Sequence, residues 1–179
     1  MQEFAKIVLL SVGAAVAYGV VHDQITARIC VEYFTVGHRP VFATTSPTLL
    51  GLGWGVIATW WVGLALGVPL ALAARLGQEP KLSAAFFLRP LGRLLGVTAL
   101  CAALAGVAGY WCAQTGVIYV PTWVEIRLPA ERHAPFLVDS CAHLASYAVG
   151  ALGGLGLIGW TVGLRRKASR AAAANSATR

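Results

Sequence analysis

Charged residues are scarce in this chain. Only 12% of its 179 residues are Asp, Glu, Lys or Arg, whereas 58% are hydrophobic and the mean hydropathy is +0.70. Average proteins carry about 25% charged residues, and a soluble domain needs them to cover its surface. The composition therefore excludes an ordinary soluble domain and indicates an integral membrane protein.

Charge is almost absent from four long apolar runs: 4–21, 49–74, 94–119 and 136–164. A bilayer core of about 30 Å needs about 20 apolar residues as helix, and in lipid the backbone has to bond within its own segment. The sequence predicts an all-α integral membrane protein with a single four-transmembrane-helix bundle over residues 1–164. Residues 165–179 are expected to be a basic, flexible cytoplasmic tail. The first run has the size of a signal peptide, but its charged n-region is weak, and we expect an uncleaved helix.

Lys and Arg are also scarce in two of the three connections. The first and third connections hold two each, whereas ten of the 14 lie near the N-terminus, in the second connection or in the tail. The positive-inside rule then predicts an N-in/C-in topology with two outer loops. The net charge of +7 follows from topology and anionic lipid, so we expect the lipid bilayer and no nucleic acid as partner.

Small residues recur at four-residue spacing within two of the runs: Gly51 and Gly55, Gly63 and Gly67, Gly150 and Gly154, Gly159 and Gly163. This spacing lets helix backbones approach closely in lipid, although Gly is also simply common in membrane helices. Such faces would pack the bundle, a second copy of the chain or another membrane protein.

The motifs of many enzymes are missing. The chain has no HExxH metal motif, no CxxCH or CxxC, no GxSxG and no glycine-rich phosphate loop outside a span. Covalent c-type haem and a thioredoxin-like redox role have no support, and a serine triad is excluded. The second and third runs hold almost no polar residues beyond Thr59, Thr98 and Gln114, so a solute pathway is not expected.

What the chain does hold is a group of ionisable residues on the predicted outer side. His22 and Asp23 close the first span, and Asp139 and His143 share a face at the start of the fourth. His and carboxylate side chains suit zinc, iron, manganese or copper. The predicted metal ligands are His22, Asp23, Glu32, His38, Asp139 and His143, supported by Tyr18, Arg28 and Tyr147.

Three alternatives to that metal site stay open. A purely structural polar network, with Arg28 paired to Asp23 or Glu32, explains the same residues, in a non-catalytic accessory or assembly subunit of a membrane complex. A b-type haem would use His22 and His143 as axial ligands. Whether the protein is an enzyme, and of which substrate, does not follow from the sequence.

Two cysteines, Cys30 and Cys141, fall on the same predicted outer side. An oxidising periplasm would allow a disulfide between them. Sequence gives no geometry, so two buried free thiols remain the alternative.

The stretch HDQITARICVEYFTVGH at 22–38, followed by Ser46-Pro47 and Gly53-Trp54-Gly55, resembles a family of small, uncharacterised four-span bacterial membrane proteins. The resemblance covers roughly the first 75 residues. It implies a multi-pass protein of the bacterial inner membrane and the same topology, and it implies no activity.

Overall fold

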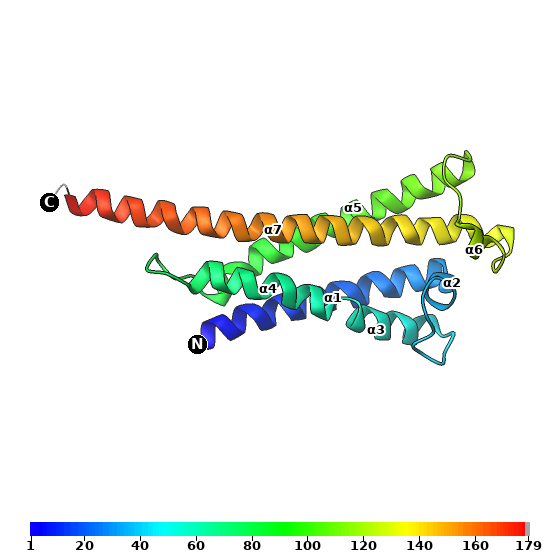
Figure 1. Cartoon of the computed structure of the whole chain (residues 1–179), viewed down its shortest axis with the longest axis horizontal. Coiled ribbons are helices and arrows are strands. Elements are labelled where there is room, and N and C mark those ends of the chain that lie inside the picture. The colour runs from blue at the N-terminus through cyan, green and yellow to red at the C-terminus, as the bar shows by residue number, and fades with distance from the viewer. Residues whose placement is uncertain (178–179) are drawn as a thin grey trace.

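The computed structural model describes residues 1–177, and within them the protein is helical with no strand (Figure 1). The helices, in chain order, are α1 (Gln2–Ile29), α2 (Val31–Thr35), α3 (Pro47–Ile57), α4 (Trp60–Arg75), η1 (Ala84–Phe87), α5 (Leu88–Gln114), α6 (Thr122–Glu125), η2 (Ala130–Arg132) and α7 (His133–Ala177).

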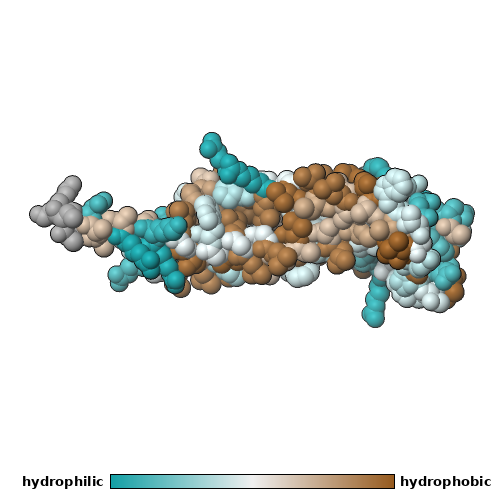
Figure 2. Space-filling model, turned by 90° about the horizontal axis from the view of Figure 1, so that it is seen from above, coloured by the Kyte–Doolittle hydropathy of each residue, from teal (hydrophilic) through white to brown (hydrophobic). Residues whose placement is uncertain are grey.

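Four helical segments are long and apolar enough to cross a membrane: Gln2–Ile29, Pro47–Arg75, Ala84–Gln114 and Ala130–Asn175. The four predicted spans are thereby confirmed as helices, which indicates a multi-pass membrane protein. Their bounds differ, because the third helix ends at Gln114 rather than at 119. Figure 2 shows the expected surface, with an apolar band between two hydrophilic ends.

The bundle consists of two packed units. Helix α1 lies along α3 and α4, and α5 lies along α7 (Figure 1). Glycine allows the first contact: a Cβ built on Gly63 would lie 2.7 Å from the Cα of Val12, and one built on Gly55 would lie 2.5 Å from the Cα of Val20. Two of the four glycine pairs thus serve packing inside the chain.

The second span is interrupted halfway. Helix α3 ends at Ile57 and α4 begins at Trp60, and the hydroxyl of Thr59 donates a hydrogen bond to the carbonyl oxygen of Gly55. Pro69, inside α4, removes a further backbone donor from this span. The interruption separates α3 from α4 at a position that faces a cavity described below.

Both termini and the α4–α5 connection lie at one end of the bundle, here called the basic end (Figure 1). The opposite end, here called the histidine end, carries α2 and α6. At the basic end α7 continues as helix to Ala177, where the sequence suggests a flexible tail. Arg165 opens this extension and is only 5% exposed, because its guanidinium donates to four carbonyl oxygens: those of Ala73, Leu76, Glu79 and Pro80.

Candidate metal centre

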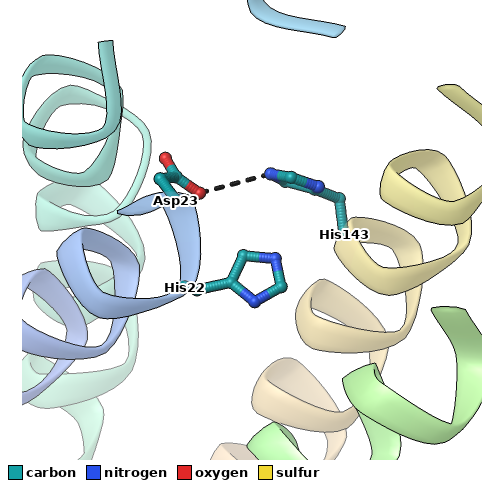
Figure 3. A group of neighbouring side chains, drawn as sticks. All are labelled: His22, Asp23 and His143. Carbon is teal, nitrogen blue, oxygen red and sulfur yellow. Dashed lines mark hydrogen bonds and ion pairs between the residues drawn. The ribbon is translucent and has the colours of Figure 1, made fainter. Parts of the chain in front are cut away.

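Three of the predicted ligands meet between α1 and α7 near the histidine end. His22 and Asp23 extend from α1 towards His143 on α7 (Figure 3). One ligand atom from each lies within 4.8 Å of the others, which is the only such group of His, Cys, Asp and Glu within residues 1–177. Asp23 is 5% exposed and His143 is 9% exposed. The side chains of two distant segments therefore form one buried cluster.

The two ring nitrogens of His143 both face oxygen atoms. Nδ1 lies 2.8 Å from the backbone carbonyl oxygen of Asp139, one turn earlier, and Nε2 lies 3.2 Å from Oδ1 of Asp23. A carbonyl oxygen only accepts, so Nδ1 carries a hydrogen and the neutral ring has a bare lone pair at Nε2. That lone pair and the Asp23 carboxylate need a positive charge between them, either a proton or a metal ion.

His22 contributes an atom that the rest of the described chain leaves without a partner. Its Nε2 is buried and has no hydrogen bond. The ring stacks on Tyr18 at a centroid distance of 5.6 Å and meets His143 edge-on at 4.6 Å. Because the two imidazoles are in direct contact, a porphyrin plane has no room between them, which disfavours the haem alternative.

Asp139, a further predicted ligand, lies beside this group but outside it. Its side chain is fully buried, and neither carboxylate oxygen has a hydrogen-bond partner within the described residues. A buried charge without a partner is costly, so Asp139 requires a proton, a water molecule or a cation that the polypeptide does not supply.

A cavity connects the cluster to the interior of the bundle. It encloses about 140 Å³ that a water molecule can reach. Its histidine end is lined by His22, Asp23 and His143 together with Tyr33 and His38, and the other end reaches Leu91 and Leu157. The ionisable residues of the lining therefore lie at one end only.

The remaining predicted residues lie apart from the three clustered ligands. Glu32 forms an ion pair with Arg132 at 2.5 Å and not with Arg28, which donates to Gln24 and Thr48 instead. This arrangement contradicts the Arg28 pairing suggested by the sequence. Burial raises the pKa of the Glu32 carboxyl most strongly, but the hydrogen bonds from Arg132, a backbone N–H and Cys30, together with the charge of Arg132, outweigh burial and lower that pKa.

His38 and Tyr147 line the cavity without joining the metal group. The Nδ1 of His38 lies 2.8 Å from the carbonyl oxygen of Tyr33, and its ring contacts Trp54. Tyr147 is 43% exposed. Tyr18 lies against the group: its ring stacks on His22 and its hydroxyl hydrogen-bonds with that of Ser146 at 2.7 Å.

The cysteines follow the second of the two alternatives. All four Cys are free in the described chain, and Cys30 and Cys141 are not joined. Cys30 is fully buried, donates to the Glu32 carboxylate, and burial raises the pKa of its thiol to about 12. A thiol that stays protonated at neutral pH is a poor nucleophile and metal ligand.

Two aromatic residues near the cluster, Tyr33 and Phe34, were not singled out from the sequence. The ring of Tyr33 stacks on His143 at 4.3 Å, and Phe34 meets the same imidazole edge-on at 5.7 Å. Both come from α2, which folds back over the cluster. In the sequence, the only sign that Tyr33 and Phe34 belong to the cluster is their position between Glu32 and His38 in an otherwise polar stretch.

Comparison with protein-family models, with curated proteins and with solved structures gives no match. The resemblance of the first 75 residues to a bacterial membrane family thus stays a prediction. What the site does has to be inferred from its own chemistry.

Proposed function

We propose that the protein binds one transition-metal ion through His22, Asp23 and His143, inside a four-span membrane bundle. The observation that supports the proposal is the lone-pair arrangement of the cluster. The bare Nε2 of His143, the Asp23 carboxylate and the unpartnered Nε2 of His22 lie together in a buried place. An ion satisfies all three at once, whereas a single proton satisfies only the first two.

The donor set favours particular ions. Two imidazoles and one carboxylate are the three protein ligands of many catalytic zinc sites and of non-haem iron(II) sites, which keep further positions open. Metal-bound histidines usually donate their other N–H to a carbonyl or carboxylate, and the Nδ1 of His143 meets the Asp139 carbonyl in this way. Zinc or iron(II) is therefore the proposed occupant, and His22, Asp23 and His143 would hold it.

The chemistry available to such an ion is Lewis-acid activation of water or of a bound oxygen atom. We infer that the protein is a membrane-embedded metalloprotein rather than a purely structural subunit.

Metal analysis of the purified protein tests the proposal. Wild type, His22→Ala and His143→Ala would be purified in mild detergent without chelator, with His133→Ala as the matched control. The Nε2 of His133 donates a hydrogen bond to the loop carbonyl oxygen of Leu128, and His133 belongs to no metal-ligand group among the described residues. We expect about one ion per chain in wild type and in the control, and most of it lost in the two site variants.

Cobalt substitution separates a specific site from adventitious metal. Apo-protein titrated with Co²⁺ should develop visible absorption bands that saturate at one equivalent and that Asp23→Asn weakens. Helical content measured by circular dichroism shows whether each variant is folded. Equal metal content in wild type and all folded variants would overturn the proposal and leave a structural polar network.

We further propose that the protein resides in the bacterial inner membrane with both termini in the cytoplasm and the histidine end in the periplasm. The support is the distribution of Lys and Arg: of the 13 within residues 1–177, nine lie at or near the basic end. Reporter fusions that fluoresce only in the cytoplasm, placed after residue 78 and at the C-terminus, should both be active. An inactive C-terminal fusion with normal expression would contradict the topology.

A further inference from the structure

The cavity beside the cluster has the shape of a site for a membrane-soluble molecule. His143 and Leu157 both line it and are 14 residues apart on α7, which corresponds to about 21 Å of helix. One leaflet of a bilayer core is about 15 Å thick. The cavity is thus long enough for a hydrocarbon chain of leaflet length with a head group at the histidine end.

Polarity along the cavity agrees with that orientation. Towards the basic end its lining is mostly apolar and small, with Ala15, Gly63 and Gly154 beside leucines, and the hydroxyls of the lining residues Ser11 and Thr98 donate to carbonyl oxygens of their own helices. Polar and aromatic residues are concentrated at the histidine end. An amphiphile that enters from the bilayer with its head at the membrane surface would meet matching surroundings along its whole length.

An opening towards lipid is present on α7. Tyr147 and Ala151, one turn apart, line the cavity and are also exposed on the outside of the bundle. They lie where the α1–α3–α4 unit and the α5–α7 unit face each other with few direct contacts between α1 and α7. A ligand can therefore pass sideways between bilayer and cavity without crossing either polar end.

The lining also restricts the head group. Among the described residues around the cavity there is no Lys or Arg, while Asp23 is present. An anionic phosphate or carboxylate head would find no positive side chain. Aromatic rings surround the polar end, from Tyr18, Tyr33, Phe34 and Trp54, and rings of this kind pack well against a flat ring. A neutral, planar head group with oxygen atoms fits these surroundings best.

We infer that the cavity binds a lipophilic quinone or its hydroquinone. The head oxygens lie against His22, Asp23 and His143, where a hydroquinone hydroxyl donates to a carboxylate or imidazole and a quinone oxygen accepts from an imidazole or meets the ion. The chain extends towards Leu91 and Leu157. The inference concerns binding alone and goes beyond the metal site, since the cavity and its opening exist without an ion.

Two glycines on α7 provide matched variants. A Cβ on Gly150 meets nothing within 4 Å, and Gly150 lines the cavity, so Gly150→Leu fills the chain portion without touching a polar group. A Cβ on Gly156 also meets nothing within 4 Å, but Gly156 is exposed and does not line the cavity. Gly156→Leu is therefore the control, and Gly150→Val is a milder second variant.

The test measures binding of a short-chain quinone with a ten-carbon tail to the detergent-solubilised protein, by quenching of tryptophan fluorescence. Of the six Trp only Trp54 lines the cavity, so the part of the quenching that is lost in Trp54→Phe is the signal that reports on the cavity. We expect saturable binding with equal affinity in wild type and Gly156→Leu, a several-fold weakening in Gly150→Val, and at least a tenfold weakening in Gly150→Leu. Unchanged affinity in folded Gly150→Leu, or no saturable binding to wild type, would overturn the inference.

A second arm tests the head group. A ten-carbon alcohol has the same tail without the ring and should compete at least tenfold more weakly than the quinone. Equal competition would show a general hydrocarbon site and reject the quinone. All titrations are run on metal-loaded and on chelator-treated protein. If the metal-free protein still binds the quinone, the quinone inference holds even where the proposed metal function fails.

Discussion

The two ends of the bundle each bury charged or ionisable side chains, but they do so in opposite ways. At the basic end Arg165 donates to four carbonyl oxygens around the end of α4 and the loop that follows. At the histidine end, in the part of the chain that the structure describes, His22 Nε2 and both oxygens of Asp139 have no partner. The polypeptide supplies hydrogen-bond partners for the buried guanidinium at the basic end, but not for these buried polar atoms at the histidine end.

This difference indicates what each end is for. Buried polar groups in proteins are nearly always hydrogen-bonded, and the exceptions usually have a functional reason or an unseen partner. Arg165 closes the last turn of α4 and connects it to α7, which is a structural role. In the histidine cluster the Nε2 of His22 has no hydrogen-bond partner among the described residues, and the proposed metal site rests on this atom.

The largest effect on stability is expected at the basic end. Arg165→Met removes the donors of several carbonyl groups, and each buried group left unpaired costs about 1–3 kcal/mol. We expect the thermal unfolding midpoint in detergent to fall more than in any other variant proposed here. Arg166→Met is the matched control, because Arg166 is exposed and should change the midpoint little. Equal midpoints for the two variants would show that the Arg165 hydrogen bonds contribute little to stability.

An increase in stability is expected from a substitution at the histidine end. Asp139→Leu replaces an unpartnered buried carboxyl by an apolar side chain of similar size, which should raise stability by about 1–3 kcal/mol. Asp139→Asn keeps polar atoms without partners and should gain less. Thermal unfolding measures both, and metal analysis of the same samples should show unchanged content. A fall in the midpoint of Asp139→Leu would mean that Asp139 has a stabilising partner.

The smallest effect is expected at the ion pair of Glu32 and Arg132, whose side chains are 26% and 31% exposed. The pKa of Glu32 is lowered by folding, so the pair stabilises the protein above about pH 4.3 and this contribution disappears as the pH falls through the lower folded pKa. Glu32→Gln should lower stability by at most about 1 kcal/mol at pH 7.

Acid should remove the difference in stability between wild type and Glu32→Gln. The midpoints of wild type and Glu32→Gln are expected to converge when measured at pH 3.5, whereas Glu131→Gln, at an exposed neighbouring acid, should match wild type at both pH values. A gap between wild type and Glu32→Gln that is as wide at pH 3.5 as at pH 7 would contradict the assignment.

The spans and the core of the site were predictable because both depend on local patterns. Hydropathy alone identifies four helices, and helical spacing places Asp139 and His143 on one face. The meeting of His22 and Asp23 with His143 needed one further assumption, that the first and last spans are close enough to touch. The structure confirms this contact through the 3.2 Å approach of Asp23 to His143.

The rest depends on contacts that no local pattern specifies. Glu32 takes its partner from Arg132, 100 residues later, rather than from the nearby Arg28. The interruption at residues 58–59 lies inside a continuous apolar run, so hydropathy does not reveal it. The cavity arises because two helix units meet along a line of small side chains, and its volume depends on their packing in three dimensions.

The glycines of this chain should differ in how strictly they are conserved among related sequences. Any descendant that keeps the α1 contact has to keep Gly55 and Gly63 without a side chain, since backbone lies within 3 Å of where a Cβ would stand. Gly92, Gly156 and Gly159 are free to drift to Ala or larger residues, because nothing stands in the way. Gly150 is sterically as free as these, so its preservation across related sequences would be the mark of a ligand rather than of the fold.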